Sequence, residues 1–337
     1  MKFNRLNIRK IAKVFVNLEK QKTKTLAMSI DNDKVTKIFC MADDFCRVYD
    51  RFVKVNGLAP KRDKSKRRYH RDGRLSDAEV ITIMILFHLG GYKCLKHFYL
   101  NEVCRNMTDP FPGLVSYNRF VELECKVVVP FILFVNRCCM GACAGISFVD
   151  STALRVCRNQ RIRLHKVFKG LAQRGQCSMG WFYGFKLHLI CSEKGELLNF
   201  MLTPGNVDDR EPLRNKSFIE QIFGRLVGDK GYICRDLFSR LFVDGIQLIT
   251  KLKSNMKGQL MTVSDKILLR KRALIETING ELKNIAQIEH SRHRSVVGFR
   301  VNLMAGQAAY SFFPKKPMIN VERVPPYENG VIQLSLF

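Results

Sequence analysis

Three acidic residues between positions 150 and 276 are spaced as a metal-dependent catalytic site would require. Asp150 and Asp229 each end a short apolar run typical of a buried strand, and Glu276 lies on a long stretch with helical spacing. Because neighbouring strands of an α/β sheet end at one crevice, we expect the two aspartates to lie close together. Mg²⁺ prefers oxygen ligands, and two ions about 3.5–4 Å apart can activate an attacking oxygen and stabilise a leaving one. The pattern predicts that these three acids hold two Mg²⁺ ions, for which Mn²⁺ would substitute.

Each acid taken alone has a plainer explanation, as a turn residue at a strand end or as a solvated helix charge. Their order along these elements favours the metal site, and so does the segment that follows Asp150. No acidic residue occurs from 151 to 192, whereas eight basic residues do. A solvated face usually mixes both signs, so we expect this segment to contact phosphodiester backbones. The candidate contacts in it are Arg155, Arg158, Arg161, Arg163 and Lys186.

The whole chain is strongly basic. Its 337 residues include 57 lysines and arginines against 30 aspartates and glutamates, a formal net charge of +27. Such an excess indicates a polyanionic partner, of which nucleic acid is the commonest; a ribosome or an anionic membrane surface is the alternative. The sequence holds no apolar run long enough to span a bilayer and no signal-peptide pattern, which favours a cytoplasmic protein. The 12 cysteines are irregularly spaced, and the cluster Cys138, Cys139 and Cys143 is expected to be core thiols rather than a zinc site.

The first part of the chain is predicted to be helical. Residues 1–27 form a basic extension without periodicity, and they could derive from an upstream start codon because Met28 opens the patterned sequence. Residues 28–145 are expected to form a helical DNA-binding region. Within it, a basic arm at 61–74 precedes Ser76 and Glu79, which form a capping box for the apolar helix that follows. Further helices are predicted near 94–105, 116–126 and 128–142.

Residues 146–313 are predicted to form an α/β catalytic domain. The expected strands are 146–150, 181–191, 197–202, 225–229 and 246–251, and the expected helices are 208–223, 235–242 and 264–287. This order matches an RNase H-like fold, in which a mixed five-stranded sheet begins with antiparallel strands and continues through crossover helices. Trp181 is expected in the core and His188 in a structural or DNA-facing position. Asp208 and Asp209 are expected at a helix N-cap, and the alternative is that they lie behind the metal-binding acids and support them.

Several blocks of this region resemble the catalytic blocks of DDE transposases from bacterial insertion sequences. They are FVDST at 148–152, TPGNVDD at 203–209, GDKGY at 228–232 and RALIETINGELKN at 272–284. Arg272, Glu276 and Lys283 reproduce the family's R-x3-E-x6-K signature, whereas its usual tyrosine is replaced by Leu269. The sequence is most similar to the insertion-sequence 982 family, through ITIMILFHLGGYKCLKHFYL at 81–100, VSYNRFVEL at 115–123 and IEHSRHRS at 288–295.

The resemblance implies that Asp150, Asp229 and Glu276 are the catalytic triad and that Lys283 binds the terminal phosphate of the DNA. The rival for the third acid is Glu281, which lies about 140° around the helix from Glu276, so the two cannot face the metals equally. Arg272 lies one turn before Glu276, where it would either contact DNA or form an ion pair with that carboxylate.

The expected function is that of a bacterial, nucleoid-associated transposase. Such an enzyme cleaves the ends of an insertion element, and the freed 3′-hydroxyls attack target DNA. An RNase H-like nuclease without strand transfer and an inactive, domesticated DNA-binding protein are the alternatives. Because two DNA ends must be synapsed, the resemblance also implies a homodimer.

Residues 314–337 are predicted to form an extended tail. It is rich in proline, yet it ends in an apolar peptide, Gln333-Leu334-Ser335-Leu336-Phe337. This peptide resembles the short motif by which bacterial proteins dock on the replicative sliding clamp, with Gln333 in a polar site and Leu334, Leu336 and Phe337 on an apolar one. The alternative is that the tail folds back into a groove of its own catalytic domain.

Overall fold

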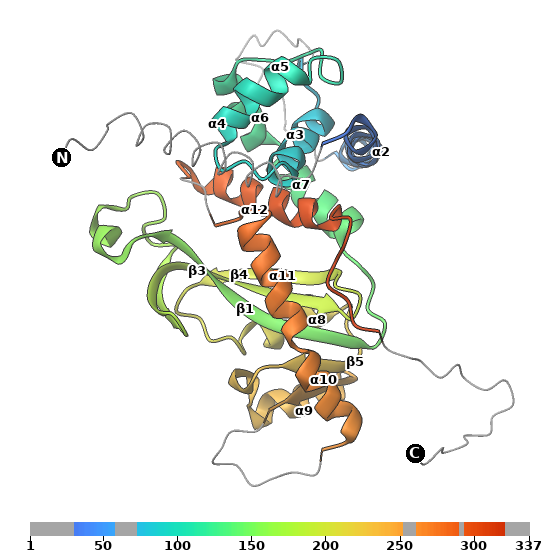
Figure 1. Ribbon diagram of the computed structural model, residues 1–337, viewed down its shortest axis with the longest axis vertical. Coiled ribbons are helices and arrows are strands. Elements are labelled where there is room, and N and C mark those ends of the chain that lie inside the picture. The colour runs from blue at the N-terminus through green and yellow to red at the C-terminus, as the bar shows by residue number, and fades with distance from the viewer. Residues whose placement is uncertain (1–29, 58–72, 252–260, 290–292, 321–337) are drawn as a thin grey trace, which may run out of the picture.

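The computed structural model describes residues 30–57, 73–251, 261–289 and 293–320. The predictions for residues 1–27, for most of the basic arm at 61–74 and for the clamp-binding peptide Gln333–Phe337 lie outside the described residues. Figure 1 shows a layer of helices stacked on a twisted sheet. No helix among the described residues is long and apolar enough to cross a membrane.

The N-terminal half is helical, as predicted. Its elements are α2 (Asn32–Val55), α3 (Asp77–Leu89), α4 (Leu95–Phe98), η1 (Tyr99–Val103), α5 (Cys104–Asn106), α6 (Tyr117–Lys126), α7 (Val128–Phe134) and η2 (Val135–Cys139). The capping box is confirmed: Glu79 N–H donates to Ser76 Oγ at 3.2 Å, and Ser76 N–H donates to the Glu79 carboxylate at 2.6 Å. Almost every side chain of α3 is buried, so α3 is the central helix of this layer.

A helix from the far end of the chain completes that layer. α12 (Val296–Ser311) packs against α3, α6 and α7, and its residues join the same apolar core (Figure 1). Two polar contacts tie α3 to the segment before α12: His88 Nδ1 lies 2.5 Å from the Ala286 carbonyl oxygen, and Gln287 Nε2 donates to Gly91 O at 3.1 Å. The helical layer therefore uses both ends of the sequence, while the division of the chain into domains stays a prediction.

The sheet contains β1 (Ile146–Cys157), β2 (Gln173–Cys177), β3 (Gly180–Ser192), β4 (Leu197–Pro204), β5 (Gly224–Gly228) and β6 (Ile246–Thr250). The strand order is β2-β3-β1-β5-β6, with β4 also paired to β3. β1 and β3, β2 and β3, and β3 and β4 pair antiparallel, whereas β1 with β5 and β5 with β6 are parallel. The mixed arrangement agrees with the prediction, but the count of five strands is wrong. The sixth strand is β2, whose sequence QRGQC lacks the alternation of apolar and polar residues that predicts a strand.

Several predicted elements differ in extent from the observed ones. β1 continues past Asp150 to Cys157, because its antiparallel pairing with β3 extends well beyond the three residue pairs that join it to β5. The stretch 208–223 holds only the short turn η4 (Pro212–Arg214) and α8 (Lys216–Ile219); Pro212 and the Asn215 cap prevent a single continuous helix. Trp181 is 62% exposed rather than in the core.

The remaining elements are η3 (Asn159–Leu164), η5 (Lys230–Tyr232), α9 (Arg235–Val243), α10 (Val263–Lys271) and α11 (Ala273–Asn284). α10 and α11 replace the single helix predicted over 264–287. They meet at Arg272, whose φ of −55° and ψ of −24° remain helical, so the two run nearly in line in Figure 1.

The two faces of the sheet are covered by different helices. Along β1 successive side chains alternate between the faces. Phe148 packs in the cluster that contains the α11 residues Leu274, Ile275, Ile278 and Leu282, whereas Val149 packs in the cluster formed with α8 and α9. Asp150, two residues after Phe148, therefore faces α11.

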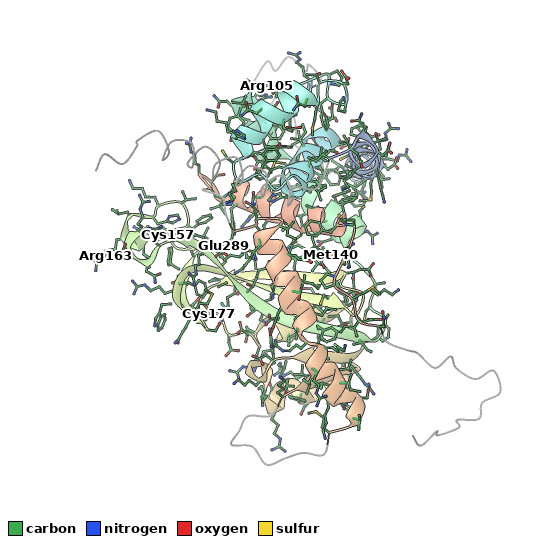
Figure 2. The ribbon with its side chains drawn as sticks, viewed as in Figure 1. Arg105, Met140, Cys157, Arg163, Cys177 and Glu289 are labelled. Atoms are coloured by element: carbon green, nitrogen blue, oxygen red, sulfur yellow. The ribbon has the colours of Figure 1, made fainter. Side chains whose placement is uncertain are left out.

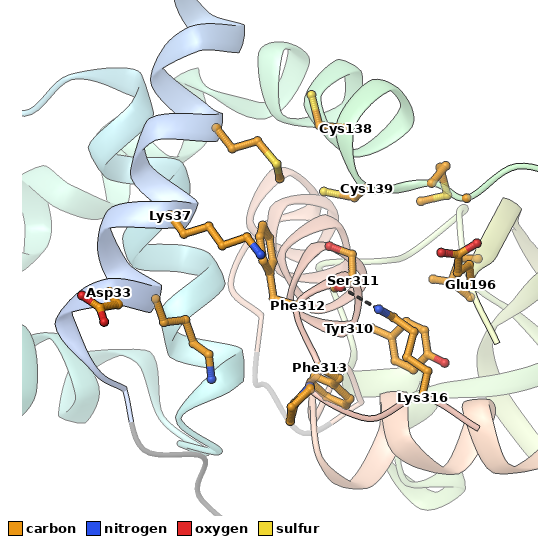
Figure 3. A pocket seen from close by; sticks show the side chains of 16 residues that line it. Asp33, Lys37, Cys138, Cys139, Glu196, Tyr310, Ser311, Phe312, Phe313 and Lys316 are labelled. Carbon is orange, nitrogen blue, oxygen red and sulfur yellow. Dashed lines mark hydrogen bonds between the residues drawn. The ribbon is translucent and has the colours of Figure 1, made fainter. Parts of the chain in front are cut away.

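The end of α12 and the residues that follow it lie beside a cavity of about 600 Å³ (Figure 3). The cavity is bounded by α2, η2, the β3–β4 turn and the end of α12; Lys316 Nζ donates to Ser311 O at 2.8 Å within it. Tyr310 donates its hydroxyl to Gly195 O at 2.6 Å, and Ile319 N–H donates to Glu193 O at 2.8 Å. Gly195 has a φ of 74°, and a Cβ there would collide with the Pro317 carbonyl, so this close approach requires glycine.

Glu124, on α6, is a buried acid whose ionisation opposes folding. Burial raises its pKa from 4.5 to about 7, so the folded state holds the proton more tightly than the unfolded chain. The contribution of this group to stability is therefore complete below pH 4.5, declines as the pH rises towards 7 and is absent above it.

We expect Glu124→Gln, which keeps the shape without the ionisation, to gain stability relative to wild type as the pH rises from 5 to 8. The change should be on the order of a few kcal/mol and visible as a shift in Tm. Glu122→Gln, on the exposed side of the same helix, is the control and should keep a constant difference. A Tm difference for Glu124→Gln that does not change with pH would contradict this assignment.

Candidate active site

Asp150 lies in the middle of β1, under α11. Asn279 of α11 donates its amide to Asp150 Oδ2 at 2.9 Å. Burial raises the pKa of Asp150 to about 6; its bond to the Ser151 backbone and the Arg272 guanidinium lower it, and the charges of Glu276 and Asp229 raise it further. The three predicted carboxylates are therefore close enough to repel one another, which is the situation a bound cation would relieve.

The second aspartate reaches the same place from β5. Asp229 follows the last residue of β5 and precedes the turn η5, so it lies at the carboxyl end of the strand that runs parallel to β1. Tyr232 of η5 is buried, and burial together with the charges of Asp150, Asp209 and Asp229 raises its pKa. Its hydroxyl has no hydrogen-bond partner among the described residues.

Glu276 comes from the first turn of α11 and is exposed to solvent. Its carboxylate accepts a bond from the Arg272 guanidinium one turn earlier, so the ion-pair alternative for Arg272 is what the structure shows. Glu281 faces elsewhere: its charge raises the pKa of Tyr310 on α12, and it does not contribute to that of Asp150. The geometry thus favours Glu276 over Glu281 as the third acid.

The donor set suits a hard divalent cation, which prefers carboxylate and carbonyl oxygens. Two buried oxygens beside the acids, Asn279 Oδ1 and the Tyr232 hydroxyl, have no partner among the described residues and would suit the water shell of such an ion. As the side chains are placed, with Arg272 on Glu276 and Asn279 on Asp150, the described residues contain no closed group of three or more His, Cys, Asp or Glu ligands. The Glu276 carboxylate would therefore have to release the Arg272 guanidinium before it could bind a cation.

A polar network supports the site from the opposite face of β1. Asp209 Oδ1 accepts from Ser151 Oγ at 2.9 Å and from Lys186 Nζ at 3.0 Å, and Lys186 also donates to Val207 O at 2.9 Å. Asp209 is therefore not the helix cap expected from sequence. Asp208 caps only locally, accepting from the backbone and guanidinium of Arg210. The two adjacent acids in TPGNVDD were the sequence signal for this network. Sequence alone could not show which of Asp208 and Asp209 bonds to Ser151 and Lys186.

The predicted DNA-contact residues fall into two groups. Lys186, Arg272 and Lys283 are engaged within the protein; Lys283 Nζ donates to Ala153 O at 2.5 Å and lies 3.4 Å from the Glu289 carboxylate. The others are exposed along the end of β1 and the following turn η3, and they are Arg155, Arg158, Arg161 and Arg163. The structure thus contains an exposed arginine strip that begins five residues after Asp150 on the same strand and continues into η3. Asn279 and Glu289 are the residues at this site that sequence reasoning missed.

His188 is a buried structural residue. Its Nε2 lies 2.8 Å from Thr203 Oγ1, and burial lowers its pKa to about 4, so it is neutral near pH 7.

Comparison with known proteins gives one family match. Residues 140–296, which include all three carboxylates, match the family model of the transposase DDE domain. The match supports a DDE transposase, the class of enzyme that carries out transposition. No curated protein matches the chain.

Among solved structures, the chain is similar to one described as a cryo-EM structure of piggyBac transposase synaptic complex with hairpin DNA. The TM-score is 0.37 at 13% sequence identity, over 70% of this chain and 51% of that one. The chain thus spans about half the length of that protein.

The hydrogen bonds of Asp209 to Ser151 and Lys186 are expected to stabilise the strands beneath the site, and substitution of Asp209 tests this. Asp209→Ala should leave the mostly buried Lys186 amine without its carboxylate and cost about 1–3 kcal/mol in the free energy of unfolding. Asp208→Ala removes an exposed pair with Arg210 and should cost less than about 1 kcal/mol. Urea unfolding of both variants measures the difference, and equal losses would show that the network contributes nothing specific.

Proposed function

We propose that this protein is a transposase that cleaves insertion-element ends and joins them to target DNA. The proposal rests on one observation above others: the charges of Asp229 and Glu276 act on the buried Asp150 of β1, the strand that also carries the first residue of the exposed arginine strip. Acidic ligands next to a strongly cationic surface suit a phosphodiester substrate, which needs its own charge neutralised and a cation at the reacting phosphate. The DDE family match over the same residues supports the assignment.

Each residue of the site has a role in this proposal. The three acids would hold two Mg²⁺ ions, for which Mn²⁺ could substitute, and the ions would supply Lewis-acid activation of the attacking and leaving oxygens. Asn279 fixes the orientation of Asp150, and Asp209 fixes Ser151 and Lys186 on the adjoining strands. Arg272 holds the Glu276 carboxylate until a cation takes its place. The exposed arginines position the DNA backbone through its phosphates.

The finer assignments belong to the same proposal. We infer a bacterial enzyme of the insertion-sequence 982 type with an RNase H-like catalytic domain at 146–313, a DNA-recognising helical region at 28–145 and a homodimer in the synaptic complex. The strand order supports the RNase H-like assignment, and the sequence blocks quoted above support the family.

The direct test is incubation of the purified chain with DNA carrying the element ends and a target plasmid, with and without Mg²⁺. Joined products that require the cation would support the transposase. Cleavage without joining would indicate a nuclease instead, and binding without cleavage would indicate a domesticated DNA-binding protein.

Substitution of each acid by alanine tests the triad. We expect Asp150→Ala, Asp229→Ala and Glu276→Ala each to reduce strand cleavage by about 10³-fold or more, and double variants to be no worse than single ones, because the ligands act as a unit. DNA affinity, measured by filter binding, should stay equal or rise, since a negative charge is removed beside a polyanion.

Glu281→Ala is the matched control from the same helix, and it should retain cleavage. If Glu281→Ala abolished cleavage while Glu276→Ala did not, the third acid would be wrongly assigned.

The tail peptide carries a separate proposal, binding to the replicative sliding clamp through Gln333, Leu334, Leu336 and Phe337. Deleting Gln333–Phe337, or changing Leu336 and Phe337 to alanine, should abolish clamp binding and spare cleavage in a purified system. Surface plasmon resonance with the isolated peptide measures this. No affinity at high micromolar peptide would exclude the clamp, and a lowered Tm of the deletion variant would favour the alternative, in which the tail occupies a groove such as the cavity of Figure 3.

A further inference from the structure

A cavity of about 810 Å³ lies beyond the catalytic acids, at the far end of β1. It is enclosed by the last residues of β1, by η3 and the loop after it, by the segment at 288–289 and by the start of α12. Figure 2 labels Cys157 and Glu289, which line it, and Arg163, which projects from the same part of the chain. Ligand cavities in proteins typically measure about 300–1,000 Å³, so this one could enclose a nucleotide but not a duplex.

The cavity is lined by positively charged side chains that form no ion pairs within the described fold. Four of its lining residues carry positive charge, and none of the four forms an ion pair with another described residue: Arg155, Arg158, Arg161 and Lys166. Its one lining acid is Glu289, and that carboxylate is engaged by Arg155 N–H at 3.0 Å and by Lys283 at 3.4 Å. The charge that remains suits one or two phosphates.

The floor of the cavity is apolar and aromatic. Phe168 and Phe299 are buried beneath it with ring centroids 5.2 Å apart, and His165 stacks on Phe168 at 5.5 Å. His165 Nε2 is buried without a hydrogen-bond partner among the described residues, so it can bond a polar edge. A nucleotide combines a planar, heteroatom-rich base with a phosphate group. It therefore matches both the aromatic floor and the positively charged residues around it.

The cavity lies at a defined distance from the reacting phosphate. Arg155 is five residues after Asp150 along one strand, which corresponds to about 16 Å. Along B-DNA that distance is about five nucleotides at 3.4 Å each. An occupant would therefore belong to the DNA segment adjoining the cleavage site, and its base must be unpaired to enter an enclosed space of this size.

We infer that this cavity binds an unpaired nucleotide of the DNA strand next to the cleavage site, with its base against the His165 ring, which the buried Phe168 supports, and its phosphates at Arg158 and Arg161. The inference rests on the proposed function and adds a preference for DNA that is unpaired a few nucleotides from the cut. Arg163 provides the matched comparison, because it carries the same charge on the same short turn as Arg161 but does not line the cavity.

The test uses the full chain without divalent cations, so that the DNA stays uncut. Three fluorescent probes are compared: a blunt duplex, a duplex with a short unpaired extension, and a duplex with an abasic extension, all matched in phosphate number. Wild type should bind the extended duplex about tenfold more tightly than the other two. Arg158→Ala/Arg161→Ala should abolish that preference, whereas Arg163→Ala should weaken all three complexes by the same factor.

Equal affinity for the normal and abasic extensions, or an equal loss of preference in Arg163→Ala and in Arg158→Ala/Arg161→Ala, would overturn the inference. In either case cation-dependent cleavage of element ends would leave the proposed function standing. Failure to bind any of the three probes would overturn both.

Discussion

The packing of α11 across β1 is the constraint on which the site depends. Four aliphatic side chains of α11 are buried against the sheet, each contributing about 1.5–3 kcal/mol. That burial offsets the cost of desolvating the Asp150 carboxylate beside two other acids, a cost on the order of a few kcal/mol. Lys283 fixes the far end of the helix on the backbone of β1, and Asn279 fixes its middle. Glu276 is placed by the same packing, because it occupies the first turn of that helix.

Positive charge is divided between two tasks in this protein. Lys186, Arg272 and Lys283 have partners inside the fold and hold strands, a carboxylate and a helix end in place. The arginines of η3 and the end of β1 have no such partners among the described residues, so their charge remains available to an external polyanion. The net charge of +27 thus indicates a polyanionic partner, whereas only the structure shows which cations are not already engaged within the described residues.

Local sequence signals predicted the elements whose formation is local. The Ser76–Glu79 box and the acids after short apolar runs were both readable from spacing. β2 was missed because its stability comes from pairing with β3, and the helix predicted over 208–223 failed because a proline and an asparagine cap divide it. Trp181 was assigned to the core on residue type alone, although it lies beside the β2–β3 turn with its side chain mostly exposed. The Asp209–Lys186 bridge joins residues 23 apart and depends on strand register, which no local pattern encodes.

The position of α12 has a consequence for how the protein is made. α3 is apolar on all sides, and one of those sides is covered by a helix that begins at Val296. During synthesis α3 leaves the ribosome long before α12 has been made. The apolar surface that α12 covers therefore stays exposed to water and to chaperones until α12 has emerged. A product shortened before Val296 would keep that surface exposed and be recognised by proteases. The fold thus makes synthesis as far as α12 a condition for a finished helical layer.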